Sequence, residues 1–178
     1  MEPTHVVWIP SSLGAVRLDW AETERGPQVW RIALPRPAGA PPQGPAKAPA
    51  RLQPLLEGLQ RFLQGQAVDF DLGLLAMERC SPFQRRVLLA EYAIPRGWVS
   101  SYGRIAAHLG QPNAARAVGT ALARNPFPLV IPCHRAVRND GRLGGFQGGL
   151  PMKQALLAQE GVAVSPTGVV LAPRWMYE

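Results

Sequence analysis

Seven prolines fall between Pro35 and Pro54, and neither a helix nor a central strand can run through a stretch so interrupted. This alanine-rich stretch is predicted to be a linker or an extended surface loop. It separates two regions with different hydrophobic patterns. Before it, apolar runs at 6–9 and 29–34 and an alternation of apolar and charged residues at 16–19 are typical of strands. After it, apolar residues recur at helical spacing. The expected fold class is therefore α/β (α+β).

With 178 residues the chain is long enough to bury a core without disulfide bonds or metals. We expect a small N-terminal α/β domain over residues 1–80, which includes the loop at 35–54. A mainly helical domain over residues 81–165 and a C-terminal tail over residues 166–178 complete the predicted organisation.

The helical region opens with a strong start signal. Ser81 is a predicted N-cap, Pro82 suits the first helical position, and Gln84 completes a capping box. This helix is expected to end near Ile94 because a proline follows. Ser101 is predicted to cap a second helix.

That second helix, expected at 102–109, is followed by a third at about 113–124, with a glycine and a proline between them. Two short helices joined in this way are typical of a helix-turn-helix. One face of the third helix is polar and is flanked by small residues that would let a backbone approach closely. This face comprises Asn113, Arg116, Thr120 and Arg124, beside Ala117 and Gly119.

The net charge of +7 favours an anionic partner, and arginine supplies nearly all the positive charge. A GC-rich coding sequence would produce the same arginine bias, and an ordinary solvated helix would show the same polar face. Composition alone leaves both alternatives open.

A possible reactive centre follows the third helix. The apolar run 127–131 is predicted to be a short buried strand that ends at Pro132 and presents Cys133 beside His134. A thiol needs a base or a positive charge to become a nucleophile, and His134 is the candidate base. Glu160 is the candidate carboxylate that orients the histidine. The alternative is a buried thiol beside a satisfied histidine.

Other features exclude whole classes of protein. Cys80 and Cys133 have no zinc-finger spacing, and three scattered histidines do not suggest a metal site. The chain has no run of 18 apolar residues and no basic-then-apolar leader. We therefore expect a cytoplasmic protein that binds neither a metal nor a membrane, with Cys80 as a structural cysteine.

Five motifs, read together, are far more specific than any one of them. They are Tyr102-Gly-Arg-Ile-Ala, Asn113-Ala-Ala-Arg116-Ala-Val-Gly, Asn125-Pro-Phe-Pro-Leu-Val-Ile-Pro-Cys133-His134-Arg135, Gly144-Gly-Phe146-Gln-Gly-Gly-Leu150 and Leu157-Ala-Gln-Glu160-Gly. The chain from about Ser81 to Val164 resembles the C-terminal domain of the O6-alkylguanine-DNA alkyltransferases, also called methylated-DNA–protein-cysteine methyltransferases. The resemblance implies a DNA repair enzyme that flips the damaged base and moves the alkyl group irreversibly to its own cysteine.

The resemblance also implies the role of each matching residue. Its catalytic positions are the acceptor Cys133, the base His134, which acts through a water, the orienting Glu160, the hinge Asn125, and Tyr102 at guanine N3. Its DNA-binding positions are Arg116, which fills the vacated stack, and Asn113, Ala117, Thr120, Arg124 and Arg135. Its pocket positions are Ala136, Phe146, Gln147 and Gly144.

Two positions depart from the usual pattern of the family: Ala136 replaces a larger aliphatic residue, and Phe146 replaces tyrosine. The resemblance further implies binding in the minor groove of double-stranded DNA, and the transfer to cysteine requires no cofactor. The N-terminal segment lacks the Cys and His ligands of the zinc site that some members have, so no metal is expected, and a monomer is the default expectation. The alternatives are a sensor that binds alkylated DNA without repairing it and a Cys-His hydrolase. Relatives that only bind damage have tryptophan at the acceptor position, so Cys133 favours the transferase.

Overall fold

The computed structural model describes residues 5–35 and 48–177. The chain divides into two compact units, one formed by Met1–Arg79 with Pro126–Val130 and the other by Cys80–Asn125 with Ile131–Glu178. This division differs from the expected one at three points. Residues 126–130 cluster with the N-terminal unit, whereas Cys80 and the tail cluster with the helical unit.

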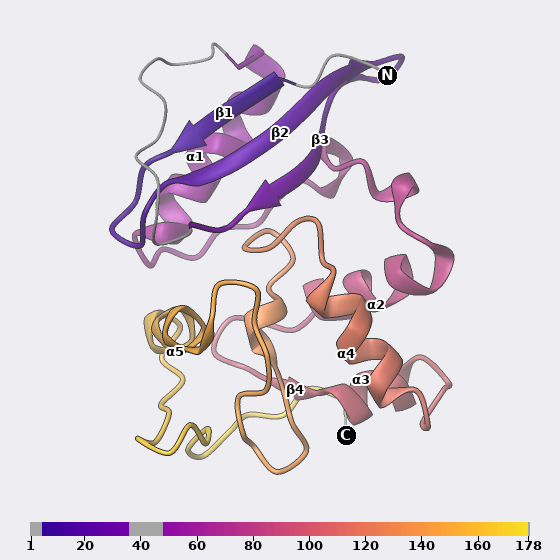
Figure 1. The fold of residues 1–178 in the computed structure, drawn as a ribbon, viewed down its shortest axis with the longest axis vertical. Helices are drawn as coiled ribbons and strands as arrows, with labels where there is room; N and C mark the ends of the chain where they lie inside the picture. The colour runs from indigo at the N-terminus through magenta and orange to yellow at the C-terminus, as the bar shows by residue number, and fades with distance from the viewer. Residues whose placement is uncertain (1–4, 36–47, 178) are drawn as a thin grey trace. The chain divides into compact units, whose positions relative to one another are not determined.

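The N-terminal unit contains a three-stranded antiparallel sheet (Figure 1). Its strands are β1 (His5–Ile9), β2 (Val16–Thr23) and β3 (Gly26–Ala33). The central strand places Leu18 opposite Val7 on one side and Ile32 on the other, and all three side chains are buried. Alternation of buried and half-exposed residues along β2 confirms the strand prediction from the same pattern.

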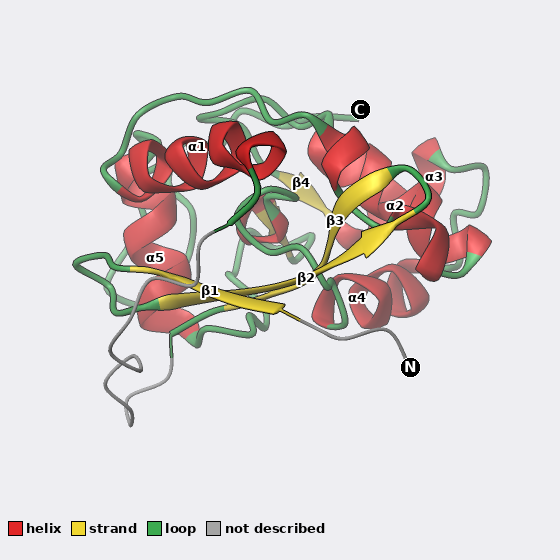
Figure 2. Ribbon diagram, turned by 90° about the horizontal axis from the view of Figure 1, so that it is seen from above, coloured by secondary structure: helices red, strands yellow, loops and turns green. Residues whose placement is uncertain are grey.

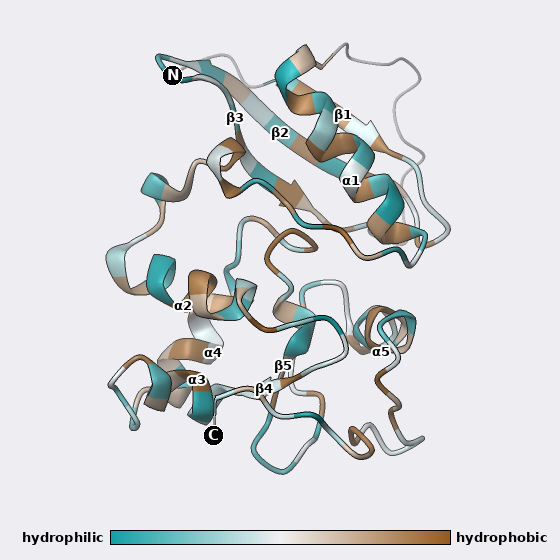
Figure 3. Cartoon of the chain, turned by 180° about the vertical axis from the view of Figure 1, so that it is seen from behind, coloured by the Kyte–Doolittle hydropathy of each residue, from teal (hydrophilic) through white to brown (hydrophobic). Residues whose placement is uncertain are grey.

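Helix α1 (Gln53–Leu63) covers one face of this sheet (Figure 2). Hydrophilic and hydrophobic residues alternate around it (Figure 3), and Leu55 and Leu59 are among those buried. A 3-10 turn at Ala50–Leu52 leads into α1, so the predicted loop ends before Pro54. Pro54 is accommodated in the first turn of the helix, where its missing N–H leaves no hydrogen bond unmade.

Two further 3-10 turns, Leu72–Leu74 and Met77–Arg79, complete the N-terminal part of this unit. The 36–47 part of the predicted loop lies outside the described residues. Across the ranges 5–35 and 48–177, no helix is long and apolar enough to cross a membrane.

The second unit is mainly helical, and its helices are α2 (Pro82–Tyr92), α3 (Tyr102–His108), α4 (Ala115–Ala123) and α5 (Leu150–Gln159) (Figure 1). Helices α3 and α4 pack together as the predicted helix-turn-helix. Helix α4 begins two residues later than expected, because Asn113 lies in a turn that the Ala114 amide closes on the Gln111 carbonyl (2.9 Å).

The capping predictions are confirmed for Ser101 and half confirmed for Ser81. Each serine accepts a hydrogen bond from the backbone amide three residues on. The Gln84 side chain does not turn back to Ser81, as a capping box requires. It donates instead to the Ala121 and Arg124 carbonyls and thereby ties α2 to the end of α4.

The predicted strand at 127–131 is wrong, although the run is buried as expected. The segment is a turn in which Leu129 has a positive φ of 75°. Pro126, Pro128 and Pro132 remove three backbone donors, so the run cannot supply the ladder that a strand needs. The Ile32 amide pairs instead with the Pro126 carbonyl (2.7 Å).

Candidate active site

A two-residue parallel ladder joins the two parts of the chain that carry the predicted chemistry. Strand β4 (Ser100–Ser101) runs directly into α3 at Tyr102, and β5 (Ala136–Val137) follows the 3-10 turn Cys133–Arg135. Ser100 pairs with Ala136 and Ser101 with Val137. The ladder therefore fixes the start of the helix-turn-helix beside the turn that bears Cys133.

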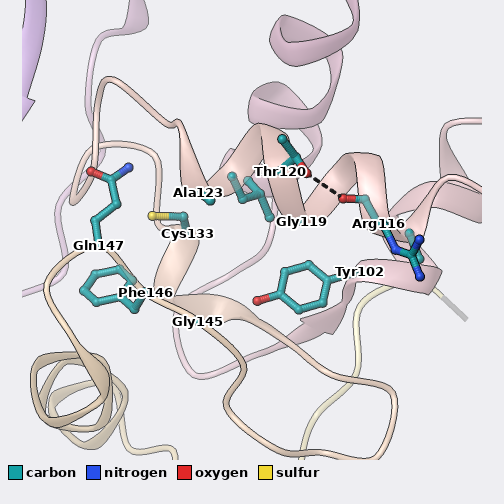
Figure 4. A pocket seen from close by; sticks show the side chains of 11 residues that line it. Tyr102, Arg116, Gly119, Thr120, Ala123, Cys133, Gly145, Phe146 and Gln147 are labelled. Atoms are coloured by element: carbon teal, nitrogen blue, oxygen red, sulfur yellow. Dashed lines mark hydrogen bonds between the residues drawn. The ribbon is translucent and has the colours of Figure 1, made fainter.

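A cavity of about 500 Å³ lies between this turn and α4. It is lined by Tyr102, Ala115, Arg116, Gly119, Thr120, Leu122, Ala123, Cys133, Gly145, Phe146 and Gln147. Figure 4 shows the Cys133 sulfur near Phe146 and Gln147, with the Tyr102 ring between them and Arg116. Six of the sequence-predicted site residues thus surround one space.

Gly144 stands against the Tyr102 hydroxyl. A Cβ atom on Gly144 would lie 2.7 Å from that oxygen, and its φ of +66° is one that other residues rarely adopt. Glycine is therefore required here on two counts. Burial raises the pKa of Tyr102 to about 12, with Glu91 and Cys133 adding to the effect, so this hydroxyl is a hydrogen-bond donor at neutral pH.

Cys133 is only 5% exposed. Burial raises the pKa of its thiol to about 12, although a hydrogen bond with the Asn125 side chain acts in the opposite direction. Asn125 also donates from Nδ2 to the Ile131 carbonyl (3.1 Å), so it connects the end of α4 to the segment before the nucleophile. The thiol is protonated at neutral pH and needs a base to react.

The candidate base and its candidate orienting carboxylate are in contact. His134 Nε2 lies 2.9 Å from Glu160 Oε1, and both side chains are buried. Burial alone would raise the pKa of Glu160, but hydrogen bonds from His134 and Arg135 lower it to about 2. Glu160 is therefore an ionised acceptor at neutral pH.

This contact determines the state of the histidine ring. Burial lowers the pKa of His134, so the ring is neutral. A carboxylate only accepts, so Nε2 must carry the ring proton and donate it to Glu160. Nδ1 is then the basic nitrogen, and the pair has the arrangement of a general base held by a carboxylate.

Arg135 differs from its expected DNA-binding role. Its side chain is buried, and it donates from Nε to Glu160 Oε2 (2.9 Å) and from Nη2 to Oε1 (2.8 Å). Nη1 donates to the Ile94 carbonyl (2.5 Å). The guanidinium therefore pairs with the ionised Glu160, a role that the sequence analysis did not assign to it.

The predicted DNA-binding residues other than Arg135 are exposed or half-exposed and border the outer face of α4. They line a second hollow of about 620 Å³, together with the N-terminal end of α2; they are Asn113, Arg116, Ala117, Thr120 and Arg124. Arg116 and Thr120 line both this hollow and the Cys133 cavity. Thr120 is held by its hydroxyl, which donates to the Arg116 carbonyl (3.1 Å).

Some of the predicted pocket residues line the cavity and others do not. Phe146 lines the cavity, and its ring meets His134 edge-on at 6.5 Å between centroids. Gln147 lines it too and donates to the Asn125 carbonyl (2.8 Å). Ala136 is fully buried and does not line the cavity, so its small side chain does not enlarge it.

Sequence reasoning missed two buried charged residues near the thiol, Lys153 and Glu91, which are both 0% exposed. Lys153 Nζ donates to the Ala136 carbonyl (2.6 Å), to Leu143 and to Gly145 (3.3 Å). It therefore holds the strand after the nucleophile and the glycine-rich loop. A lysine three residues before a buried leucine was the available signal, since it interrupts an apolar helix face.

In the described ranges, no three His, Cys, Asp or Glu residues are grouped so that they could hold a metal ion.

Comparison with known proteins gives one consistent family. Residues 82–162 match the family model for the DNA-binding domain of 6-O-methylguanine DNA methyltransferase. A methylated-DNA–protein-cysteine methyltransferase from Methanothermobacter thermautotrophicus is 47% identical over 116 residues, which are 65% of each chain. One from Mycolicibacterium paratuberculosis is 48% identical over 105 residues, 59% of this chain and 62% of the relative. The chain thus spans less than two thirds of these relatives.

Solved structures match over a greater length. The Mycobacterium tuberculosis O6-methylguanine methyltransferase has a TM-score of 0.71 and 31% identity, covering 89% of this chain and 93% of that chain. A Mycobacterium tuberculosis OGT in complex with DNA has a TM-score of 0.69 at 31% identity, covering 88% and 92%. These similarities, over nearly whole chains, place this chain in the O6-methylguanine-DNA methyltransferase family.

Proposed function

We propose that this protein repairs DNA by moving the alkyl group of O6-alkylguanine irreversibly to Cys133, once per molecule. The observation that carries the proposal is the position of Cys133 in the 500 Å³ cavity, next to the neutral His134 that Glu160 orients. A cavity of this size accommodates a flipped base, and a base within a duplex cannot offer its exocyclic group to a buried thiol.

In the proposed reaction His134 takes the thiol proton through a water, and the sulfur attacks the alkyl carbon. The new C–S bond forms as the carbon–oxygen bond to guanine breaks, and the bonding pair stays with the base. Tyr102 donates a hydrogen bond to guanine N3 as that charge develops. The released guanine regains, through water, the proton that the thiol gave to His134, and His134 returns to its neutral state. The thioether product is a poor leaving group, so the enzyme is consumed.

We further infer that α4 enters the minor groove of double-stranded DNA and that the protein binds as a monomer. The small residues Ala117 and Gly119 let the helix backbone approach DNA, and Arg116 replaces the flipped base in the stack. Arg116→Ala should weaken transfer from duplex DNA by about tenfold or more, because unstacking costs a few kcal/mol. Arg61→Ala, an exposed change on α1, is the matched control.

A cytoplasmic location belongs to the same proposal, because Cys133 must remain a reduced thiol to react.

The test is the intact mass of the protein after mixing with a short duplex that carries one O6-methylguanine. We expect a gain of one methyl group that saturates at one per molecule, maps to Cys133 and is lost in Cys133→Ala. Tight binding of the damaged duplex with no gain in mass would assign the protein to the sensors of alkylated DNA instead. Methyl transfer in Cys133→Ala would show that the acceptor is misassigned.

A further inference from the structure

Glu91 is a charged residue that the proposed reaction does not use. It lies on the buried face of α2, one turn after Val87, and is 0% exposed. Neither of its carboxylate oxygens makes a well-formed hydrogen bond among the described residues, although the backbone of Ala136 lies close enough to favour the ionised form. An ionised carboxylate in such a place is costly, so an unpartnered acid deep in a protein calls for an explanation.

Its surroundings are the reactive centre. Helix α2 packs against the 3-10 turn that carries Cys133. Glu91 interacts electrostatically with Lys153 of α5 and with Arg135 of that turn, and its charge acts in turn on Cys133, Tyr102 and Tyr177. Lys153 also interacts with the Cys133 sulfur. The thiol therefore stands within the field of one buried acid and one buried ammonium group.

We propose that Glu91 is a further residue of the transfer reaction, one that acts on the Cys133 thiol through its charge and not on DNA. When Glu91 holds a proton it carries no charge, and the charge of Lys153, which favours the thiolate, remains. When Glu91 ionises, its negative charge opposes a second negative charge on the sulfur. This inference rests on the proposed function, in which the Cys133 thiol is the acceptor. Because it concerns the reactivity of that thiol, it can also be tested without DNA.

The electrostatics of the cluster support the protonated form at neutral pH. Burial raises the pKa of Glu91 to about 8, although Lys153, Arg135 and the nearby backbone of Ala136 lower it. Burial lowers the pKa of Lys153 to about 8, against the opposing charges of Cys133 and Glu91. The acid is therefore mostly neutral at pH 7, and it acquires its charge as the pH passes through 8.

The test is the rate at which iodoacetamide labels Cys133 between pH 6.5 and 9.5, followed by peptide mass. Glu91→Gln keeps the shape of the protonated acid and cannot ionise. We expect the ratio of its labelling rate to that of the wild type to rise about tenfold across this range, since one pKa unit of thiol is a tenfold change in thiolate. Glu57→Gln, an exposed change on α1, should give a constant ratio.

A ratio for Glu91→Gln that does not change with pH would overturn the proposal, because lost packing alters access equally at every pH. Glu91→Asp retains an ionisable group, so its labelling rate should depend on pH as that of the wild type does. This variant keeps the test decisive if Glu91→Gln folds poorly. The same ratio measured for methyl transfer from O6-methylguanine DNA should follow the labelling ratio. Labelling that behaves as expected in a protein that transfers no methyl group would establish the effect of Glu91 on the thiol and refute the proposed function.

Discussion

Glu160 and Glu91 are the same residue type, buried in the same unit, and they are in opposite charge states. Glu160 accepts hydrogen bonds from His134 and Arg135, and its pKa is lowered to about 2. Glu91 has no side-chain donor among the described residues and only the backbone of Ala136 beside it, and its pKa is raised to about 8. Burial favours the neutral acid in both, so the hydrogen-bond donors account for the difference.

The comparison shows how one small region supports two roles. An ionised Glu160 can orient a neutral histidine, as a base for the thiol requires. A protonated Glu91 adds no negative charge beside a sulfur that must itself become negative.

Loss of the ionised carboxylate should have the largest effect. Glu160→Gln is expected to slow methyl transfer by about 10³–10⁴-fold, because His134 loses the group that fixes its tautomer. It should also destabilise the fold by about 3–5 kcal/mol, since the buried Arg135 is left without its anion. Single-turnover rates and denaturant unfolding measure the two losses. Equal losses in Glu91→Gln would refute the distinction between the acids.

The contributions of the two acids to the unfolding free energy should change in opposite directions as the pH rises. The folded-state pKa of Glu160 is depressed, so its contribution is present above pH 4.5 and is lost as the pH falls toward 2. That contribution is about 3 kcal/mol at 1.36 kcal/mol per unit. The folded-state pKa of Glu91 is raised, so its contribution is present below pH 4.5 and is lost as the pH rises through 8.

Unfolding free energies of the wild type, Glu160→Gln and Glu91→Gln at intervals from pH 3 to 9 test these windows. Glu160→Gln should flatten only the acid limb, and Glu91→Gln should flatten only the decline between pH 4.5 and 8. The account fails if either variant flattens the limb assigned to the other.

A substitution in the glycine-rich loop that Lys153 binds should have a smaller effect on stability and on transfer. Gly144→Ala should lower the unfolding free energy by about 1–3 kcal/mol, because the new side chain combines a positive φ with a clash against the Tyr102 hydroxyl. Methyl transfer should slow as well, since Tyr102 must move. Gly65→Ala is the control. Gly65 has a φ of +85°, but a Cβ atom added there would meet no other atom within 4 Å, so this variant should lose stability without slowing transfer.

The smallest effect is expected at Phe146, beside the base. Phe146→Tyr adds a hydroxyl at the cavity wall and should leave stability within about 0.5 kcal/mol. One added hydrogen bond to the flipped base is worth about 1 kcal/mol, so the transfer rate should rise about fivefold. Second-order rates with O6-methylguanine duplex provide the measurement, and a slower variant would show that the hydroxyl points away from the base.

Much of this architecture follows from local sequence signals. The alternation in β2, the caps Ser81 and Ser101 and the prolines on either side of the loop are short-range patterns, and they located the elements to within a few residues. The site residues from Cys133 to Glu160 came from the combined motifs. They would not have followed from Cys133 and His134 alone, since that pair has a common structural explanation.

What the sequence left out has two physical sources. The first is that a charged residue in a sequence carries no sign of its burial: nothing local marks Glu91 and Lys153 as buried, or Arg135 as the partner of a buried carboxylate. The strand predicted at 127–131 failed for a different reason: hydrophobicity was weighed above the donors that three prolines remove. Burial and backbone pairing are tertiary properties, so the structure was needed to supply both.

The most direct test of the contrast between the two acids is a carbon-13 NMR titration of glutamate side-chain carboxyls, with Glu91 and Glu160 assigned by their Glu→Gln variants. We expect the Glu91 signal to titrate near pH 8 and the Glu160 signal to stay ionised down to about pH 2, or until the protein unfolds. Titration of both signals near the ordinary value of 4.5 would contradict the account.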